Sequence, residues 1–470
     1  MKLLFASAEI YPYAKTGGLA DVAQALPRAL AKSIEVLSVM PLYDFIDRTH
    51  FGISSLDQFM WVKLGKNYYK IALYQGYNQG VETLFLYEPL LCCYQAPYGN
   101  EHGDYPNNDL RFGIFSKALV TLSQLYAVDL LHLNDWHTAL AALWSREINP
   151  KLHTVFTIHN LAFQGIYPQT TMKILGLDSS YFKPDEIEYW GDINYMKAGI
   201  AYSDAVTTVS PRYAREILQP HFGCGLDGFL RVYQHKLYGI LNGIDTLLFN
   251  PKSDLTITQN YHSGTLKYKK INKYTFCKKS GLEYAKRALF IFIGRFTGQK
   301  GVDIIIQTLP KLLNMELNIA ILGEGDPTMA EKMLDIAREY PNLSVLFGYD
   351  ESLSHNMYAS ADFLLMPSSF EPCGLNQLIS LRYGTLPIVH RVGGLYDTII
   401  DIDDLSSSIC GRGIAIETLE PDSLTRAVER ALILYKSSND FTLKAQHNMH
   451  CDVSFDKSAE EYLDIYYSLD

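Results

Sequence analysis

The sequence predicts an α/β protein built from two doubly wound parallel sheets. Short apolar runs rich in β-branched residues recur along the chain, and each is followed by a stretch compatible with a helix. Strands that are buried on both faces of a parallel sheet show such continuous apolar runs. The runs fall into two series, separated by a polar, lysine-rich stretch at residues 252–280. At 470 residues the chain exceeds one ordinary core, which favours two or three domains.

The first series of predicted strands lies in the N-terminal half of the chain. A helix is predicted to begin near Leu19, and another is predicted over residues 109–127. The predicted strands of this series are residues 2–6, 34–40, 129–133, 154–158 and 205–209.

The second series follows residues 252–280, a stretch that contains no clear strand and is interpreted as a loop with an amphipathic connection. A hinge is predicted near the preceding "GILNGID" at residues 239–245, which gives domains at 1–243 and 244–454 that face each other across a cleft. The predicted strands are residues 288–293, 317–322, 343–347, 362–366 and 385–389, with helices over 301–313, 327–339 and 422–436.

Composition excludes several classes of protein. The formal net charge of −10 argues against a general nucleic-acid binder, which needs basic surfaces. The cysteines are odd in number and show no C-x-x-C spacing, which is typical of a reduced, cytoplasmic protein. The N-terminus is apolar for only a few residues and resembles a first buried strand rather than a signal peptide. No apolar run approaches the ~20 residues of a membrane span.

The stretch "AKTGGLADV", residues 14–22, combines Lys15, the diglycine Gly17–Gly18 and Asp21 at the start of a helix. Glycines let a ligand approach the backbone, and a helix N-terminus after a parallel strand favours phosphate. The pattern is neither the dinucleotide fingerprint nor a Walker loop. The alternative is a glycine turn with a solvated lysine.

A second basic segment, "GRFTGQKG" at residues 294–301, follows the predicted strand 288–293. Arg295 and Lys300 flank one strand-to-helix loop, where a guanidinium and an ammonium group together suit a pyrophosphate. The alternative is ordinary surface charge. On the functional interpretation, this loop supplies the second side of the predicted cleft.

Polar clusters follow two strands of the first half. "NDWHT" at residues 134–138 carries Asp135 and His137, and "HNLAFQG" at residues 159–165 begins with His159 and Asn160. Both clusters come where a parallel sheet presents its ligand-facing edge. For Asp135 the alternative is a helix N-cap without a chemical role.

In the second half, "PSSFEPCGLNQL" at residues 367–378 follows a predicted strand and precedes a helix that opens at Leu375. Gly374 can present amides to a phosphate, while Glu371 can accept hydrogen bonds from sugar hydroxyls. The alternative for Cys373 is a small buried apolar residue. A second diglycine loop, "VGGLYDT", lies at residues 392–398. The histidines show no metal-binding spacing, and no Ser-His-Asp arrangement is evident.

Taken in order, these segments resemble the bacterial glycogen synthases and plant starch synthases. The resemblance rests on "KTGGLAD", "TIHNLAFQG", "GILNGID", "GRFTGQKG", "FEPCGLNQL" and "YGTLPIV" followed by "GGLYDT", and it runs to the C-terminal "DKSAEEYLDIYYSLD". It therefore covers essentially the whole chain.

The resemblance implies a GT-B glycosyltransferase with two Rossmann-like domains facing each other across a deep cleft. It implies that glucose passes from ADP-glucose to the non-reducing 4-hydroxyl of an α-1,4-glucan, such as glycogen or a maltooligosaccharide, with retention of configuration. Neither a metal nor another cofactor is expected. Residues 455–470 are expected to form a helix that crosses back to the first domain.

The resemblance also assigns roles to individual residues. It implies that Arg295 and Lys300 hold the pyrophosphate and that Tyr349 stacks on adenine. The residues expected to take part in catalysis are His159, Glu371, Arg295, Lys300 and Asp135. Those expected to bind substrate are Lys15, Gly17, Gly18, Asp21, Asn160, Asn242, Tyr349, Cys373, Gly374 and Leu375.

Three positions depart from the family pattern: Asn134 stands where a histidine is common, His390 occupies a place that is often basic, and Val392 replaces a frequent threonine. The alternatives are the same fold using UDP-glucose or another nucleotide sugar, or a catalytically silent glucan-binding protein. The intact Lys15, Arg295, Lys300 and Glu371 argue against the silent protein. The sequence leaves the oligomeric state open.

Overall fold

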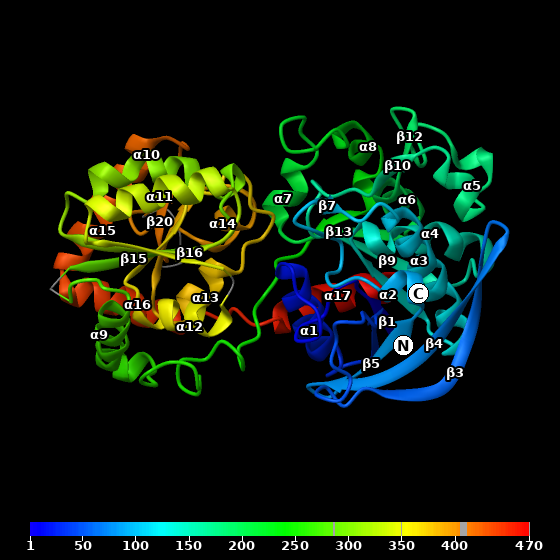
Figure 1. Cartoon of the computed structure of the whole chain (residues 1–470), viewed down its shortest axis with the longest axis horizontal. Coiled ribbons are helices and arrows are strands. Elements are labelled where there is room, and N and C mark those ends of the chain that lie inside the picture. The colour runs from blue at the N-terminus through cyan, green and yellow to red at the C-terminus, as the bar shows by residue number, and fades with distance from the viewer. Residues whose placement is uncertain (285–286, 349, 405–410, 470) are drawn as a thin grey trace. The chain divides into compact units, whose positions relative to one another are not determined.

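The computed structural model describes residues 1–284, 287–348, 350–404 and 411–469. The chain forms two compact units, one comprising Met1–Gly243 with Phe455–Asp470 and the other Ile244–Ser454 (Figure 1). The expectation that the units face each other across a cleft stays a prediction.

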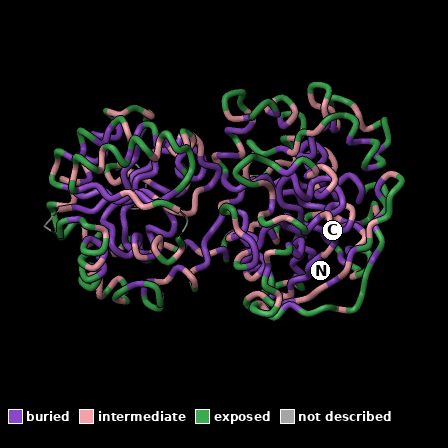
Figure 2. The backbone as a smooth tube through the Cα atoms, viewed as in Figure 1, coloured by how far each residue is buried: buried purple, intermediate pink, exposed green. Residues whose placement is uncertain are grey.

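The first unit is built on a nine-stranded sheet in the order β14-β13-β9-β8-β1-β2-β5-β4-β3. Strands β14 to β5 run parallel, whereas β4 and β3 join antiparallel at one edge. The central strands are almost entirely buried (Figure 2). The bounds are β1 Lys2–Ala6, β2 Glu35–Pro41, β3 Ser54–Leu64, β4 Asn67–Asn78, β5 Val81–Tyr87, β8 Leu130–Asn134, β9 His153–Ile158, β13 Ala205–Thr208 and β14 Leu237–Gly239.

Helices cover this sheet. Helices α3, α4 and α6 pack side by side, and α1 packs with α17, the last helix of the chain. Tyr462 and Tyr466 of α17 share a core with Leu26 of α1, and the Tyr466 hydroxyl lies 2.6 Å from Nδ1 of His132 in β8. The bounds are α1 Gly18–Leu30, α2 Pro89–Cys92, α3 Asn108–Leu125, α4 Trp136–Ile148, α5 Thr171–Leu175, α6 Tyr195–Tyr202, α7 Pro211–Glu216, α8 Asp227–Val232 and α17 Asp456–Ser468.

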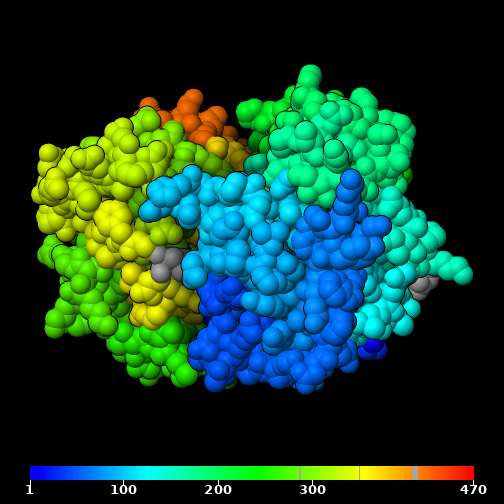
Figure 3. Space-filling view, turned by 45° about the vertical axis from the view of Figure 1, so that its right-hand side comes forward, coloured from blue at the N-terminus to red at the C-terminus, as the bar shows by residue number. Residues whose placement is uncertain are grey.

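The edge strands β3 and β4 were not among the predicted strands. Their residues alternate between a buried and a solvated face, so the sequence lacks the continuous apolar run of a doubly covered strand. Phe59, Trp61 and Tyr68 are exposed on the outer face of this hairpin, which lies on the surface of the first unit (blue in Figure 3).

The second unit has a six-stranded, wholly parallel sheet in the order β17-β16-β15-β18-β19-β20. Helices α10, α11 and α15 share a core with one face, and α9, α12 and α13 share a core with the other (Figure 1). The strands are β15 Ala288–Ile293, β16 Leu317–Gly323, β17 Leu343–Phe347, β18 Phe363–Met366, β19 Leu386–His390 and β20 Ile414–Ile416. The helices are α9 Lys269–Lys279, α10 Val302–Leu312, α11 Pro327–Glu339, α12 Glu351–Ser360, α13 Asn376–Arg382, α14 Gly393–Thr398, α15 Pro421–Lys436 and α16 Ser438–Met449.

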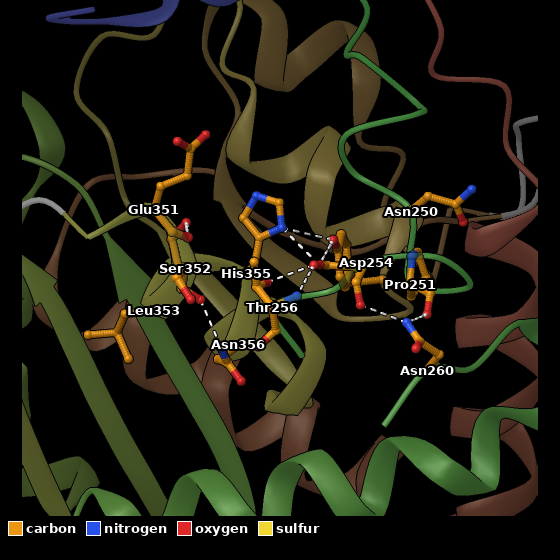
Figure 4. Close-up of polar contacts among 12 residues, drawn as sticks. Asn250, Pro251, Asp254, Thr256, Asn260, Glu351, Ser352, Leu353, His355 and Asn356 are labelled. Carbon is orange, nitrogen blue, oxygen red and sulfur yellow. Dashed lines mark hydrogen bonds and ion pairs between the residues drawn. The ribbon is translucent and has the colours of Figure 1, made fainter. Parts of the chain in front are cut away.

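The polar stretch at residues 252–280 was expected to be a loop with an amphipathic connection. In the structure several of its side chains are buried in the second unit and form hydrogen bonds there. Asp254 accepts hydrogen bonds from Nδ1 of His355 at 2.8 Å and from the Tyr383 hydroxyl at 2.5 Å, all three side chains being buried (Figure 4 shows the first contact). Burial opposes ionisation, but the bonds from His355, Thr256 and Tyr383 lower the pKa of Asp254 to about 2. The Lys269 ammonium, which is also buried, donates to the Tyr358 and Tyr383 carbonyls.

Among the residues that the structure describes, no helix is long and apolar enough to cross a membrane. The six cysteines in the same part of the chain are free thiols.

Candidate active site

In the first unit, the loop between β1 and α1 carries the stretch that the sequence singles out. Helix α1 begins at Gly18, with Gly17 as its N-cap. The Lys15 ammonium lies 2.7 Å from the Asp21 carboxylate, so these two predicted residues form an ion pair one turn into the helix. Lys15 also lies over the ring of Tyr11, 5.2 Å from its centroid.

Packing does not require a glycine at position 17. Gly17 is exposed, has φ −162°, a value that any residue adopts, and would carry a Cβ with no atom within 4 Å. The free space beside Gly17 faces solvent, where a ligand can approach the backbone.

Sequence reasoning missed Glu9, the residue that organises this loop. Its carboxylate is only 3% exposed and accepts hydrogen bonds from the Thr16 amide, from the Thr16 hydroxyl at 2.6 Å and from the Tyr98 hydroxyl at 2.6 Å. Burial raises the pKa of Glu9, while these bonds and the Gly17 amide act in the opposite direction. The only signal in the sequence was an acidic residue shortly after an apolar strand, and Glu9 belongs to none of the recognised motifs.

Asp135 occupies the N-cap position of α4, yet its side chain makes no capping bond. Its backbone has φ 56°, and Oδ1 instead accepts the His159 amide at 2.7 Å. Asp135 therefore does not cap α4 through its side chain, and its chemical role stays a prediction. Burial raises the pKa of Asp135 to about 7, although the bonds from the His159 and Asn160 amides lower it.

The His159 ring is held in one tautomer. Asn134 Nδ2 donates to the Ala6 carbonyl at 2.9 Å, which leaves Asn134 Oδ1 to accept from His159 Nε2 at 2.8 Å. Burial lowers the pKa of His159 to about 3, so the ring is neutral at neutral pH and keeps Nδ1 as its acceptor. Asn134, noted in the sequence as a departure from the family pattern, thus orients His159.

His137, on α4, is buried and stacks on Tyr98, with ring centroids 4.4 Å apart. Asn242 is buried too, and its Oδ1 has no hydrogen-bond partner within the described ranges. Asn160 follows His159 directly and is half-buried.

In the second unit, the structure brings together Lys300 and Glu371, which are far apart in the sequence. The Lys300 ammonium donates to Glu371 Oε2 at 2.6 Å, and the Ser368 hydroxyl donates to the same oxygen at 3.2 Å. Gly301 makes this approach possible, because it has φ 70° and a Cβ there would lie 1.9 Å from the Pro367 carbonyl.

Arg295 lies in the same strand-to-helix loop as Lys300. Its side chain is exposed and makes no hydrogen bond or ion pair with the part of the chain that the structure describes. An arginine fork in this position is available to an anionic ligand.

The diglycine at residues 393–394 supports Glu371 rather than forming an open loop. A Cβ on Gly393 would lie 2.0 Å from the Glu371 carbonyl, and one on Gly394 would lie 2.2 Å from the Cys373 carbonyl. The Gly394 amide donates to the Glu371 carbonyl at 3.1 Å. Close packing of α14 therefore holds the backbone from Glu371 to Cys373 in place.

The remaining residues of this segment line the same turn. Cys373 is buried, while Gly374 and Leu375 are half-buried. Gln377 Nε2 donates to the Cys373 and Gly374 carbonyls at 3.0 and 2.9 Å. Helix α13 begins at Asn376, one residue after the expected Leu375.

Tyr349, the residue expected to stack on adenine, lies outside the described residues. Within those residues, no group of three or more histidine, cysteine, aspartate or glutamate side chains could hold a metal ion.

Two family models match the chain. Residues 2–232 match the starch synthase catalytic domain, and residues 274–448 match glycosyl transferases group 1. The glycogen synthase of Aquifex aeolicus is 40% identical over 99% of this chain and 98% of that protein. The glycogen synthase of Syntrophotalea carbinolica is 36% identical over 99% of this chain and 98% of that protein. The chain belongs to the glycogen and starch synthase family.

A solved structure of the same family shows the same fold. The catalytic domain of starch synthase IV from Arabidopsis thaliana, bound to ADP and acarbose, matches with a TM-score of 0.93 at 30% identity, over 100% of this chain and 99% of that one. The predicted GT-B fold is therefore confirmed, and the chain is a glycosyltransferase of the glycogen synthase type.

The raised pKa of Asp135 predicts that Asp135→Asn becomes more stable relative to wild type as the pH rises. A carboxyl group whose pKa rises from about 4 unfolded to about 7 folded stabilises the fold at low pH and loses this contribution as pH rises to 7. The free energy of unfolding of the variant should gain about 2–3 kcal/mol over wild type between pH 5 and pH 8, as measured by urea unfolding. An unchanged difference at the two pH values would show that Asp135 is ionised throughout.

Proposed function

We propose that the enzyme transfers glucose from ADP-glucose to the non-reducing 4-hydroxyl of an α-1,4-glucan and retains the configuration at the anomeric carbon. The observation that carries the proposal is the strand-to-helix loop that presents an exposed Arg295 together with Lys300. The guanidinium and the ammonium group carry one positive charge each, and together they suit a diphosphate. The Arabidopsis relative, whose structure contains ADP and acarbose, supports the same donor class.

In the second unit, Lys300 and Arg295 bind the diphosphate and stabilise the charge on the departing ADP. Lys300 exchanges its contact with Glu371 for a phosphate oxygen, and Glu371 is then free to accept hydrogen bonds from sugar hydroxyls. Cys373, Gly374 and Leu375 line the turn beside Glu371. Charge stabilisation of this kind acts mainly in the transition state.

In the first unit, Lys15, Gly17, Gly18 and Asp21 approach the donor, with the exposed Gly17 allowing contact with the backbone. The neutral ring of His159 orients the transferred glucose, because its tautomer is fixed by Asn134. Asn160 and Asn242 add polar contacts to the sugar. Asp135 holds the His159 backbone in place through its amide.

Retention is proposed to proceed by attack on the same face, with the leaving phosphate helping to deprotonate the acceptor. Neither candidate carboxylate is assigned to the anomeric carbon: Asp135 accepts the His159 amide, and Glu371, once Lys300 has moved to the phosphate, accepts hydrogen bonds from sugar hydroxyls. A covalent glucosyl-enzyme trapped on either residue would overturn this route. Cationic side chains take the place of a metal in this proposal, and full activity in a chelator is its expected consequence.

The donor preference is tested by incorporation of labelled glucose into glycogen from ADP-glucose and, separately, from UDP-glucose. We expect transfer from ADP-glucose at a kcat/KM at least about 10-fold higher than from UDP-glucose, a difference of about 1.4 kcal/mol. Preference for UDP-glucose would support the alternative donor. Incorporation from neither would contradict the proposed function.

Removal of the Lys300 ammonium should slow the reaction. For Lys300→Ala we expect kcat to fall about 10²-fold or more with ADP-glucose, since the lost charge acts on the leaving diphosphate. Lys311→Ala in the same unit is the matched control, because Lys311 is exposed and pairs only with the exposed Asp422 among the described residues. Equal kcat values for the two variants would place the diphosphate elsewhere.

Gly17→Ala tests whether the space beside the first diglycine is used by substrate. Since an added Cβ meets no atom, we expect an unchanged melting temperature but a KM for ADP-glucose raised about 5-fold or more. Gly228→Ala in α8, whose Cβ would meet only Arg231 at 3.7 Å, serves as the control. A normal KM for Gly17→Ala would remove this loop from the donor site.

A further inference from the structure

We propose that Glu9 is a positioning residue that holds the segment Lys15–Gly18 in the shape in which it meets the donor. The inference rests on the proposed donor role of Lys15 and Gly17. Glu9 is not part of any motif that the sequence analysis singled out, and no ligand contact is required of it.

The hydrogen-bond donors around Glu9 match the two oxygens of its carboxylate. Its two carboxylate oxygens receive the Thr16 amide, the Thr16 hydroxyl and the Tyr98 hydroxyl, and the Gly17 amide also contributes. An ionised carboxylate only accepts hydrogen bonds, so it satisfies all of these donors at once. The main chain of Glu9 is fixed in turn, because its carbonyl accepts the Ser7 hydroxyl at 2.7 Å.

No cation forms an ion pair with Glu9 among the residues that the structure describes. The nearby Lys15 pairs with Asp21 instead. Burying a carboxylate without a cation is unfavourable unless hydrogen bonds compensate. The Thr16 amide and the Thr16 and Tyr98 hydroxyls offset part of this cost, while burial still leaves the pKa of Glu9 raised. The conformation of residues 16–17 and the burial of Glu9 therefore depend on each other.

Glu9 is also connected to the other polar residues of the first unit's site. Tyr98, which donates to Glu9, stacks on His137, with ring centroids 4.4 Å apart. His137 lies two residues after Asp135, whose Oδ1 holds the His159 amide. Glu9 therefore joins the loop after β1 to the polar cluster that follows β8 and β9.

Two substitutions separate positioning from a direct electrostatic role. In Glu9→Gln, the amide oxygen can accept the Thr16 amide while its NH2 group donates to the two hydroxyls, which are able to accept. Glu9→Ala removes every one of these contacts. A positioning role therefore predicts that Gln largely rescues what Ala loses.

The experiment measures KM for ADP-glucose, kcat and melting temperature for both variants, alone and combined with Lys15→Ala. We expect Glu9→Ala to raise KM about 10-fold or more and Glu9→Gln to stay within about 3-fold of wild type. In the Lys15→Ala background, Glu9→Ala should add less than about 2-fold, because both changes act through one loop. Glu35→Ala, which removes an exposed carboxylate of the same unit, is the control.

The outcomes are distinguishable. If Glu9→Gln raises KM as strongly as Glu9→Ala while both melt at the normal temperature, the charge of Glu9 acts directly. This result would overturn a positioning role. A lowered melting temperature with normal kinetic constants would leave Glu9 a purely structural residue and also overturn the proposal. If the increases in KM caused by Glu9→Ala and by Lys15→Ala multiply in the double variant, Glu9 does not act through Lys15, and the coupling alone is refuted. If Lys15→Ala by itself has a normal KM, the donor role of the loop is refuted.

If Glu9→Ala does not fold, Thr16→Val carries the test. It removes one hydroxyl donor and keeps the amide, so we expect KM to rise about 3-fold and this rise to disappear in the Lys15→Ala background. A Thr16→Val enzyme with the KM of wild type, or a rise that persists beside Lys15→Ala, would contradict the proposal.

Discussion

The parallel pairing of β1, β8 and β9 is the constraint on which the first unit's site depends. Parallel strands end at the same edge of a sheet, so the residues that follow them meet although they are distant in the sequence. Asn134 donates to the Ala6 carbonyl, and the His159 amide donates to the Asp135 carboxylate, so both bonds join neighbouring strand ends. The second unit uses the same geometry, since the loops after β15 and β18 bring Lys300 to Glu371.

Buried acidic groups are the common chemical feature of these strand ends. Glu9, Asp135 and Glu371 are all buried, and each is compensated differently. Glu9 has amide and hydroxyl donors, Asp135 has the His159 amide and a raised pKa, and Glu371 has a lysine. Such arrangements lower stability relative to apolar packing, which is typical of sites selected for chemistry. The rest of each sheet supplies the apolar core that tolerates them.

Much of the fold could be predicted because doubly covered parallel strands produce apolar runs that stand out in one sequence. The hairpin β3–β4 was missed because its alternation leaves one face solvated. Lys15 and Lys300 could be predicted from local motifs, whereas Glu9 and Asn134 act through partners distant in the sequence. The two diglycines look alike in sequence, but close backbone packing requires Gly393 and Gly394 and does not require Gly17. The residues next to each diglycine do not reveal this difference in backbone packing.

Helix α17 gives the chain an unusual order of assembly. Phe455, Tyr462 and Tyr466 complete the core that contains Leu3 and Leu26. The core of the N-terminal part of the chain can therefore form fully only after the C-terminal helix has been synthesised. At roughly 5–20 residues per second, synthesis of the intervening Ile244–Ser454 keeps that core incomplete for roughly 10–40 seconds. During this interval the surface that α17 will cover on α1 is open on the ribosome. Apolar surface exposed in this way makes an unfinished chain prone to aggregation, which is the situation in which chaperones act.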